Sequence, residues 1–222
     1  MARKTMPEPY RLADKALKIL NKKIVTRFRR TGQALQISGF DELNVYTGLK
    51  ALFKQLSSDC ENLFRELAAE RYKEMILFLS GKKPQKKDVD FLVEVYLTGL
   101  LKEPNDVTKY AWEAESIRKR DRTIESVIAS QRRAEKEKEL QKSMRYWSRQ
   151  NDFYIDIIAD DMALQAMKDC GVNLVRWNAE KDHKVCVECE KRRNKTYRID
   201  EVPVKHPNCR CWLTPVKSGN SK

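Results

Sequence analysis

The stretch WSRQNDFYIDIIADDMALQAMKDCGVNLVRW, residues 147–177, contains two different patterns that meet at Gly171. Up to Gly171 the apolar residues recur every three or four positions, which is the spacing of one face of an α-helix. Glycine is also the residue best suited to the left-handed turn that closes a helix. After Gly171 the segment VNLVRW alternates and is β-branched, as in a strand. The stretch therefore predicts that a helical part of the chain ends here and a β-rich part begins.

Helical spacing also extends towards the N-terminus, where apolar residues recur every three or four positions between residues 12 and 67. Two segments interrupt it. SGKKPQKKD, residues 80–88, contains a proline, which lacks an N–H donor and crowds the preceding turn. The second segment is KEPNDV at 102–107, which predicts that the helix is interrupted at 102–106. We expect hinges at both places, and one long helix from the second break to Gly171, whose middle, residues 130–145, has almost no apolar face.

Three strand-like segments follow Gly171, namely VNLVRW, KTYRIDEVP and RCWLTPV, at 172–177, 195–203 and 210–216. The sequence therefore predicts a mainly α protein. Its expected parts are a helical body over residues 1–171, a small β-rich Cys/His module over residues 172–216 and a frayed tail over residues 217–222.

The expected module contains four of the six cysteines and both histidines. A module of about 45 residues buries too little apolar area to offset chain entropy, so such modules usually carry a metal or disulfides. Pairs of ligands with two residues between them, as in Cys186-x-x-Cys189 and His206-x-x-Cys209, suit tetrahedral zinc. The sequence predicts a structural zinc site with four ligands drawn from five candidates: Cys186, Cys189, His206, Cys209 and Cys211. Disulfides or free thiols are the alternative, and a reducing cytosol disfavours disulfides.

No catalytic residue is predicted from the cluster. A zinc deaminase needs a glutamate two positions after a histidine, and His183 is followed by Lys184 and Val185. The remaining cysteines, Cys60 and Cys170, are expected to be small buried hydrophobic residues. Trp177 and Trp212 are expected to pack the small core of the module.

Charge suggests the class of partner. The chain has 45 Lys and Arg against 32 Asp and Glu, a formal net charge of +13. Such a charge favours polyanions through counterion release, so nucleic acid is the expected partner, with a merely solvated charged surface as the alternative. The most apolar run, MILFLSG at 75–81, is far shorter than the roughly 20 residues that span a bilayer. We therefore expect no association with a membrane. The N-terminal residues lack the apolar core of a secretory signal, so we expect the protein to be made in the cytosol.

The ordered features of residues 172–216 resemble a known family. They are the Trp177 strand, Asp182 followed by Val185-Cys186-x-x-Cys189, the Tyr197 strand after a basic turn, Pro203, and His206-Pro207-x-Cys209-Arg210-Cys211 leading to Pro215. This set resembles the C-terminal domain of the phage Mu protein F-like family, the minor head or head morphogenesis proteins of tailed bacteriophages. Family members often carry glycine in the basic turn, where we expect Asn194 to take the positive φ angle.

The resemblance implies a bacteriophage minor capsid protein present in few copies and associated with the phage portal protein during procapsid assembly. Scaffold or major capsid protein and packaged double-stranded DNA, contacted without sequence specificity, are further implied partners. The implied location is the host cytoplasm during assembly and then the virion, inside the head near the portal vertex, with a role in DNA delivery.

The resemblance also bears on the ligands. In the family the position of Cys189 alternates between Cys and His, and Arg often stands at the position of Cys186, which favours Cys189, His206, Cys209 and Cys211. The alternative function is a zinc-dependent, DNA-acting enzyme of nuclease type. It requires a general base beside an open metal site, and His183 and His206 are the only histidines in the chain.

Overall fold

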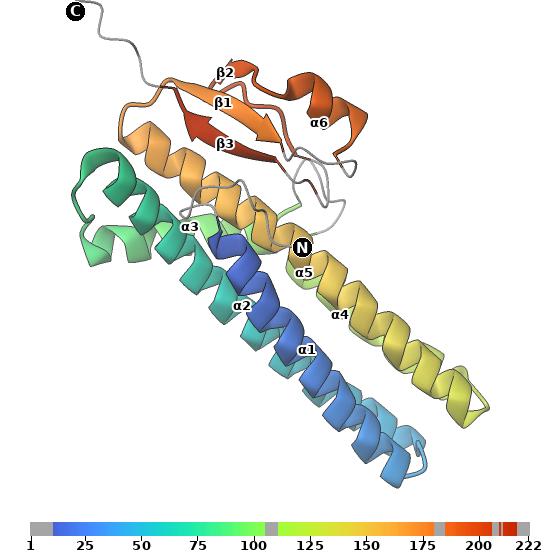
Figure 1. Ribbon diagram of the computed structural model, residues 1–222. Helices are drawn as coiled ribbons and strands as arrows, with labels where there is room; N and C mark the ends of the chain where they lie inside the picture. Colours follow the sequence, from blue (N-terminus) through green and yellow to red (C-terminus); the bar gives the residue numbers. More distant parts are fainter. Residues whose placement is uncertain (1–10, 105–110, 180–184, 206–208, 210, 217–222) are drawn as a thin grey trace, which may run out of the picture. The chain divides into compact units, whose positions relative to one another are not determined.

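The computed structural model describes residues 11–104, 111–179, 185–205, 209 and 211–216. These residues form a mainly α protein with a small antiparallel sheet near the C-terminus, as predicted (Figure 1). The elements in chain order are α1 (Leu12–Ile37), α2 (Glu42–Ser80), α3 (Lys86–Lys102), α4 (Trp112–Ala129), α5 (Arg133–Asp169), β1 (Leu174–Ala179), α6 (Val187–Arg192), β2 (Thr196–Arg198) and β3 (Cys211–Pro215).

The chain divides into two compact units, and the boundaries fall inside helices. The first, here called the sheet unit, comprises residues 1–16, 65–94 and 153–222. The second, here called the helical unit, comprises residues 17–64 and 95–152. The predicted division after residue 171 separates helical from β-rich sequence, whereas the sheet unit combines the β-rich residues with the second halves of α2 and α5.

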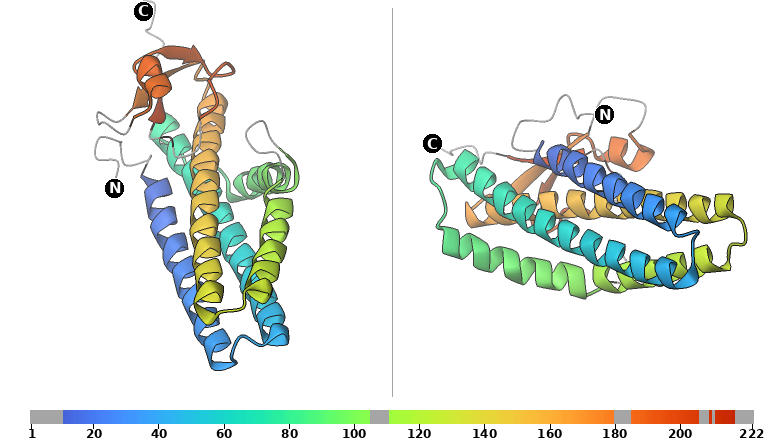
Figure 2. Two further views of the ribbon diagram at one scale, coloured as in Figure 1. Left: turned by 90° about the vertical axis from the view of Figure 1, so that its right-hand side faces the viewer. Right: turned by 90° about the horizontal axis from the view of Figure 1, so that it is seen from below.

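In the helical unit, α1 lies beside the first half of α2, and α4 lies beside the first half of α5 (Figures 1 and 2). The turn between α1 and α2 has positive φ at Gly39 and Phe40, and the Asp41 carboxylate accepts a hydrogen bond from the Asn44 N–H. The core is aromatic. The Trp147 ring lies 5.5 Å from the Phe53 ring and 6.2 Å from the Trp112 ring, measured between centroids.

The prediction of one long helix after the second break is wrong, because the chain turns at residues 130–132 between α4 and α5. Ser130 has an extended backbone, with φ −69° and ψ 129°, and its hydroxyl donates to the Ser126 carbonyl. Serine side chains compete with the helical hydrogen bonds in this way. The reversal allows Val127 of α4 and Leu140 of α5 both to be buried in the helical unit.

The other helix breaks lie where the sequence predicts them. α2 ends at Ser80 and α3 begins at Lys86, and α3 in turn ends at Lys102. α5 is closed by Gly171, whose φ of 73° allows the Val172 N–H to donate to the Met167 carbonyl at 2.9 Å. None of the helices in the described part of the chain has the length and apolar content that a bilayer span requires.

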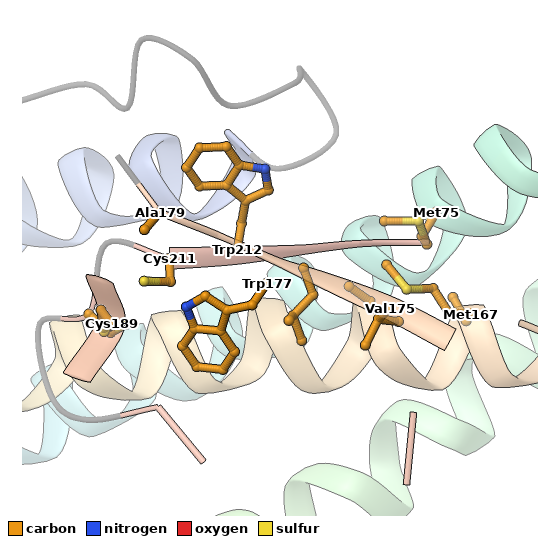
Figure 3. Close-up of a cluster of buried hydrophobic side chains, with 12 residues drawn as sticks. Met75, Met167, Val175, Trp177, Ala179, Cys189, Cys211 and Trp212 are labelled. Atoms are coloured by element: carbon orange, nitrogen blue, oxygen red, sulfur yellow. Dashed lines mark hydrogen bonds between the residues drawn. The ribbon is translucent and has the colours of Figure 1, made fainter. Parts of the chain in front are cut away.

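The sheet unit contains the three predicted strands in the order β2-β1-β3, all antiparallel. Alternate residues of β1 are buried, so Val175, Trp177 and Ala179 face the core. Asn194 has a φ of 62°, as expected, and its N–H donates to the Trp177 carbonyl. The strands share one hydrophobic cluster with helical residues, among them Met75 of α2 and Ala163, Ala166 and Met167 of α5 (Figure 3).

Candidate metal centre

Three buried cysteines meet at one edge of the sheet unit's core. The Sγ atoms of Cys189, Cys209 and Cys211 all lie within 4.8 Å of one another, and those of Cys189 and Cys209 are 3.5 Å apart. Each residue is at most 3% exposed. Figure 3 shows Cys189 and Cys211 beside Trp177, with Met75 and Met167 towards the other end of β1.

Local structure places each thiol. Cys186 is the N-cap of α6, and its sulfur accepts a hydrogen bond from the Cys189 backbone N–H at 3.4 Å. This cap fixes the start of α6, and Cys189 lies in the first turn of the helix, where it is buried. Cys211 is the first residue of β3 and pairs with Ala179 of β1, and Cys209 precedes it by two residues. A short helix and a strand edge therefore bring the three thiols together.

A lysine lies beside the thiols. The Lys205 ammonium donates to the Cys211 carbonyl at 2.6 Å and forms an ion pair with Asp160 of α5. The Lys205 side chain is only 13% exposed. The pair thus attaches the segment before Cys209 to α5 and places a positive charge near the sulfurs.

The electrostatics favour one thiolate within the group. A hydrogen bond from the Cys211 thiol lowers the pKa of Cys209 most, and the Lys205 charge lowers it further, against the opposing effect of burial. The same hydrogen bond, followed by burial, raises the pKa of Cys211. Burial, and then a hydrogen bond with Cys186, raises the pKa of Cys189. A metal ion binding here would displace the protons of the remaining thiols.

The donor set fits a metal ion. A tetrahedral site with zinc–sulfur bonds of about 2.3 Å places its sulfurs about 3.8 Å apart. The 3.5 Å separation of Cys189 and Cys209, and the 4.8 Å limit for all three, are close to that value. A disulfide needs about 2.05 Å, and an odd number of thiols cannot all pair. All six cysteines lie in the described part of the chain, and none of them forms a disulfide there. The cluster can therefore hold a metal ion.

The structure brings together three of the five predicted ligands. Among the described residues, Cys186 is not part of the group of three, although its sulfur contacts the Cys189 amide. His206 lies outside the described residues, as do His183 and Asp182.

The other expectations have different outcomes. Trp177 and Trp212 are buried, as predicted, and so is Cys60, where burial raises the pKa of the thiol. The prediction that Cys170 is buried is wrong, since it is only half-buried. It directly follows Asp169, which ends α5 and accepts a hydrogen bond from the Tyr72 hydroxyl at 2.5 Å.

Two features of the site were not predicted. The helix α6 has acidic residues in its first turn and basic residues in its last, a pattern that favours a helix and was available in the sequence. The ion pair of Asp160 and Lys205 joins residues far apart in the chain, and no local pattern indicates it.

Comparison with protein-family models, with curated proteins and with solved structures found no match to this chain.

Proposed function

We propose that this protein is a bacteriophage minor capsid protein, a head morphogenesis protein that associates with the portal during procapsid assembly. The proposal is supported by the ordered features of residues 172–216 that resemble the phage Mu protein F-like family. One structural observation carries it: among the described residues, the Trp177 strand, the Tyr197 strand and the strand that begins at Cys211 form one small sheet, with Trp177 in the core and the thiols of Cys189, Cys209 and Cys211 gathered together. A set of scattered motif residues would not have that arrangement.

The metal in this proposal is zinc, in a structural role. Cys189, Cys209 and Cys211 supply three soft donors, and structural zinc sites commonly have three or four cysteines. Bound zinc would contribute folding free energy to the sheet unit. The ammonium of Lys205 partly offsets the negative charge that three thiolates and one divalent cation leave behind.

The fourth ligand is Cys186 or His206. Zinc content in the variants Cys186→Ser and His206→Ala separates the two, because only the variant that lacks the fourth ligand loses affinity. Serine at the N-cap of α6 still accepts the Cys189 N–H, so the helix itself is retained in the first variant.

The proposed protein is not an enzyme. Catalytic zinc keeps an open position for water, whereas a set of buried thiolates is typical of structural sites. The alternative, a zinc-dependent nuclease, predicts that the zinc-loaded protein nicks supercoiled plasmid. We expect no nicking, and nicking that a chelator abolishes would favour the alternative.

The proposed partners are the portal protein, scaffold or major capsid protein, and packaged double-stranded DNA. The net charge of +13 supports the contact with DNA. In this proposal the protein is in the host cytoplasm during assembly and then in the virion near the portal vertex, where it assists DNA delivery.

The deciding experiment is co-expression with the cognate portal protein, followed by size-exclusion chromatography. We expect the two to elute together as a complex. A variant lacking the zinc-binding thiols, Cys189→Ala with Cys209→Ala, tests whether the sheet unit takes part. Elution of the wild-type protein separately from portal, scaffold and major capsid proteins would overturn the proposal.

A further inference from the structure

Among the five long helices α1 to α5, the net positive charge is concentrated in α1. α1 contains seven lysines and arginines against one aspartate. The other long helices are balanced: α2 has five cations and six acids, α3 three and three, α4 four and four, and α5 seven and eight. Although α1 is shorter than α2 or α5, it accounts for a charge of six in a net +13.

The balanced helices neutralise many of their cations locally. Arg118 pairs with Glu115 on α4, and on α5 Arg133 pairs with Glu137 and Lys142 with Glu139. Pairs at these spacings are the usual way in which a charged helix surface is stabilised. The sequence of α1 offers no such partner after Asp14.

Two of the α1 cations hold the helix in the helical unit. Lys23 and Arg27 both form ion pairs with Asp59 of α2. The other four in this unit, Lys18, Lys22, Arg29 and Arg30, are exposed, and in the part of the chain that the structure describes none of them has an ion pair. We call these four residues the α1 cation face.

The geometry of this face suits a phosphate backbone. Lys18, Lys22 and Arg29 follow one another at four and seven residues, which aligns them on the side of α1 away from the buried Leu20 and Ile24. They extend over about 16 Å of helix axis. One DNA strand carries a phosphate about every 3.4 Å of axis, so each cation can contact a different phosphate.

We propose that the α1 cation face is the surface through which this protein contacts the backbone of double-stranded DNA. This inference rests on the DNA contact of the proposed function and assigns it to a place. Lysine is depleted at protein–protein interfaces, whereas Lys and Arg supply most phosphate contacts, so the face fits DNA better than a protein partner. The binding is independent of base sequence.

The test compares two variants that each lose three positive charges. The first is Lys18→Gln, Lys22→Gln, Arg29→Gln. The matched control is Lys82→Gln, Lys83→Gln, Lys87→Gln, which changes three exposed lysines around the start of α3 that have no ion pair in the described residues. Glutamine has nearly the helix propensity of lysine, so both should fold, and the melting temperature checks this.

The measurement is fluorescence anisotropy with a labelled DNA duplex of about 30 base pairs over a series of salt concentrations. Each lost phosphate contact reduces the slope of log K against log salt by about 0.9. In the first variant we expect the magnitude of this slope to fall by about 2.7, because three contacts are lost. Its affinity at low salt should fall at least about tenfold. We expect the control to bind like the wild type. The charge-conserving variant Lys18→Arg, Lys22→Arg should also bind like the wild type.

Three results would overturn the inference. Equal losses in both variants would show that only the total charge matters. A wild-type protein that does not bind the duplex would remove the DNA contact while leaving the portal association, which is measured separately, untouched. Unchanged DNA binding combined with lost portal co-elution in the first variant would assign the α1 cation face to an acidic protein surface.

Discussion

The sulfurs of Cys189 and Cys209 lie 3.5 Å apart, although one belongs to the short helix α6 and the other precedes β3. At this distance they are not bonded to each other, yet both can contact one ion. The Cys211 sulfur lies within 4.8 Å of both, so the three thiols together could hold a metal ion.

We expect the purified protein to contain about one zinc per chain and Cys209→Ala to lose it. The Cys209 sulfur is one of three that lie within 4.8 Å of one another, so its loss removes one of the donors that the site requires. Plasma mass spectrometry measures the zinc. Cys170→Ala is the control, because Cys170 is a half-buried thiol outside the cluster, and it should retain the metal. Full zinc content in Cys209→Ala would contradict the assignment.

Trp112→Phe should destabilise the helical unit more than Trp147→Phe. Both indoles are buried, but the Trp112 N–H donates to the Asn151 side-chain oxygen at 3.1 Å, while the Trp147 N–H has no hydrogen-bond partner among the residues that the structure describes. Removing the first N–H leaves the fully buried Asn151 oxygen unpaired, which costs about 1–3 kcal/mol. Urea unfolding followed by circular dichroism measures the difference, and equal losses would show that this hydrogen bond is unimportant.

Arg71→Ala should lower the free energy of unfolding by about 3 kcal/mol or more. Arg71 is 1% exposed, and its Nε donates to the Ala159 carbonyl at 3.1 Å, so the substitution leaves a cavity and removes this buried hydrogen bond. Arg65→Ala is the control on the same helix. Arg65 pairs with Glu94 at the surface, and its loss should cost less than about 1 kcal/mol. Similar costs for the two variants would refute this prediction.

Asp59 should contribute its full stabilisation above about pH 4 and lose it progressively as the pH falls below that value. Burial acts to raise the pKa of this carboxyl, but the hydrogen bond and charge of Arg27 and the charge of Lys23 outweigh it and lower the pKa. A carboxyl whose pKa is lower in the folded state stabilises the protein above its unfolded pKa of about 3.9, and this contribution is lost as the pH falls further. Near neutral pH, the free energy of unfolding of the wild type should exceed that of Asp59→Asn by about 1–2 kcal/mol.

The pH series that tests Asp59 compares the unfolding free energies of the wild type and Asp59→Asn between about pH 3 and pH 7. Their difference should shrink below about pH 4. Asp90→Asn, which changes an exposed carboxylate on α3, should alter stability by less than about 0.5 kcal/mol. A difference that stays constant over the whole series would exclude the ion pair as its cause.

Local patterns in the sequence predict the parts of this fold that local forces decide. The helices follow from apolar residues at three-to-four spacing, and Gly171 and Asn194 both have the positive φ expected of them. The turn at residues 130–132 contains neither glycine nor proline. It depends on burying Val127 and Leu140 together, which is a tertiary effect, so the sequence pattern suggests one uninterrupted helix instead.

The candidate site was predictable as a set of donors but not as an arrangement. Spacing identifies five candidates, and only the folded chain shows that Cys209 and Cys211 lie with Cys189 while Cys186 caps α6. The contribution of Lys205 depends on α5, which supplies Asp160. Such contacts between distant segments have no periodic signal.

The sheet shares its hydrophobic cluster with α2 and α5, and this limits how the protein can be divided. Val175, Trp177 and Leu213 pack in one cluster with Met75 and Met167. A fragment that begins at Val172 would expose this apolar face to water even with a metal ion bound to the three thiols, and we infer that it would aggregate. Transferring the last fifty residues to another protein would therefore require two matching helical surfaces as well, so evolution could exchange this region only together with its helices.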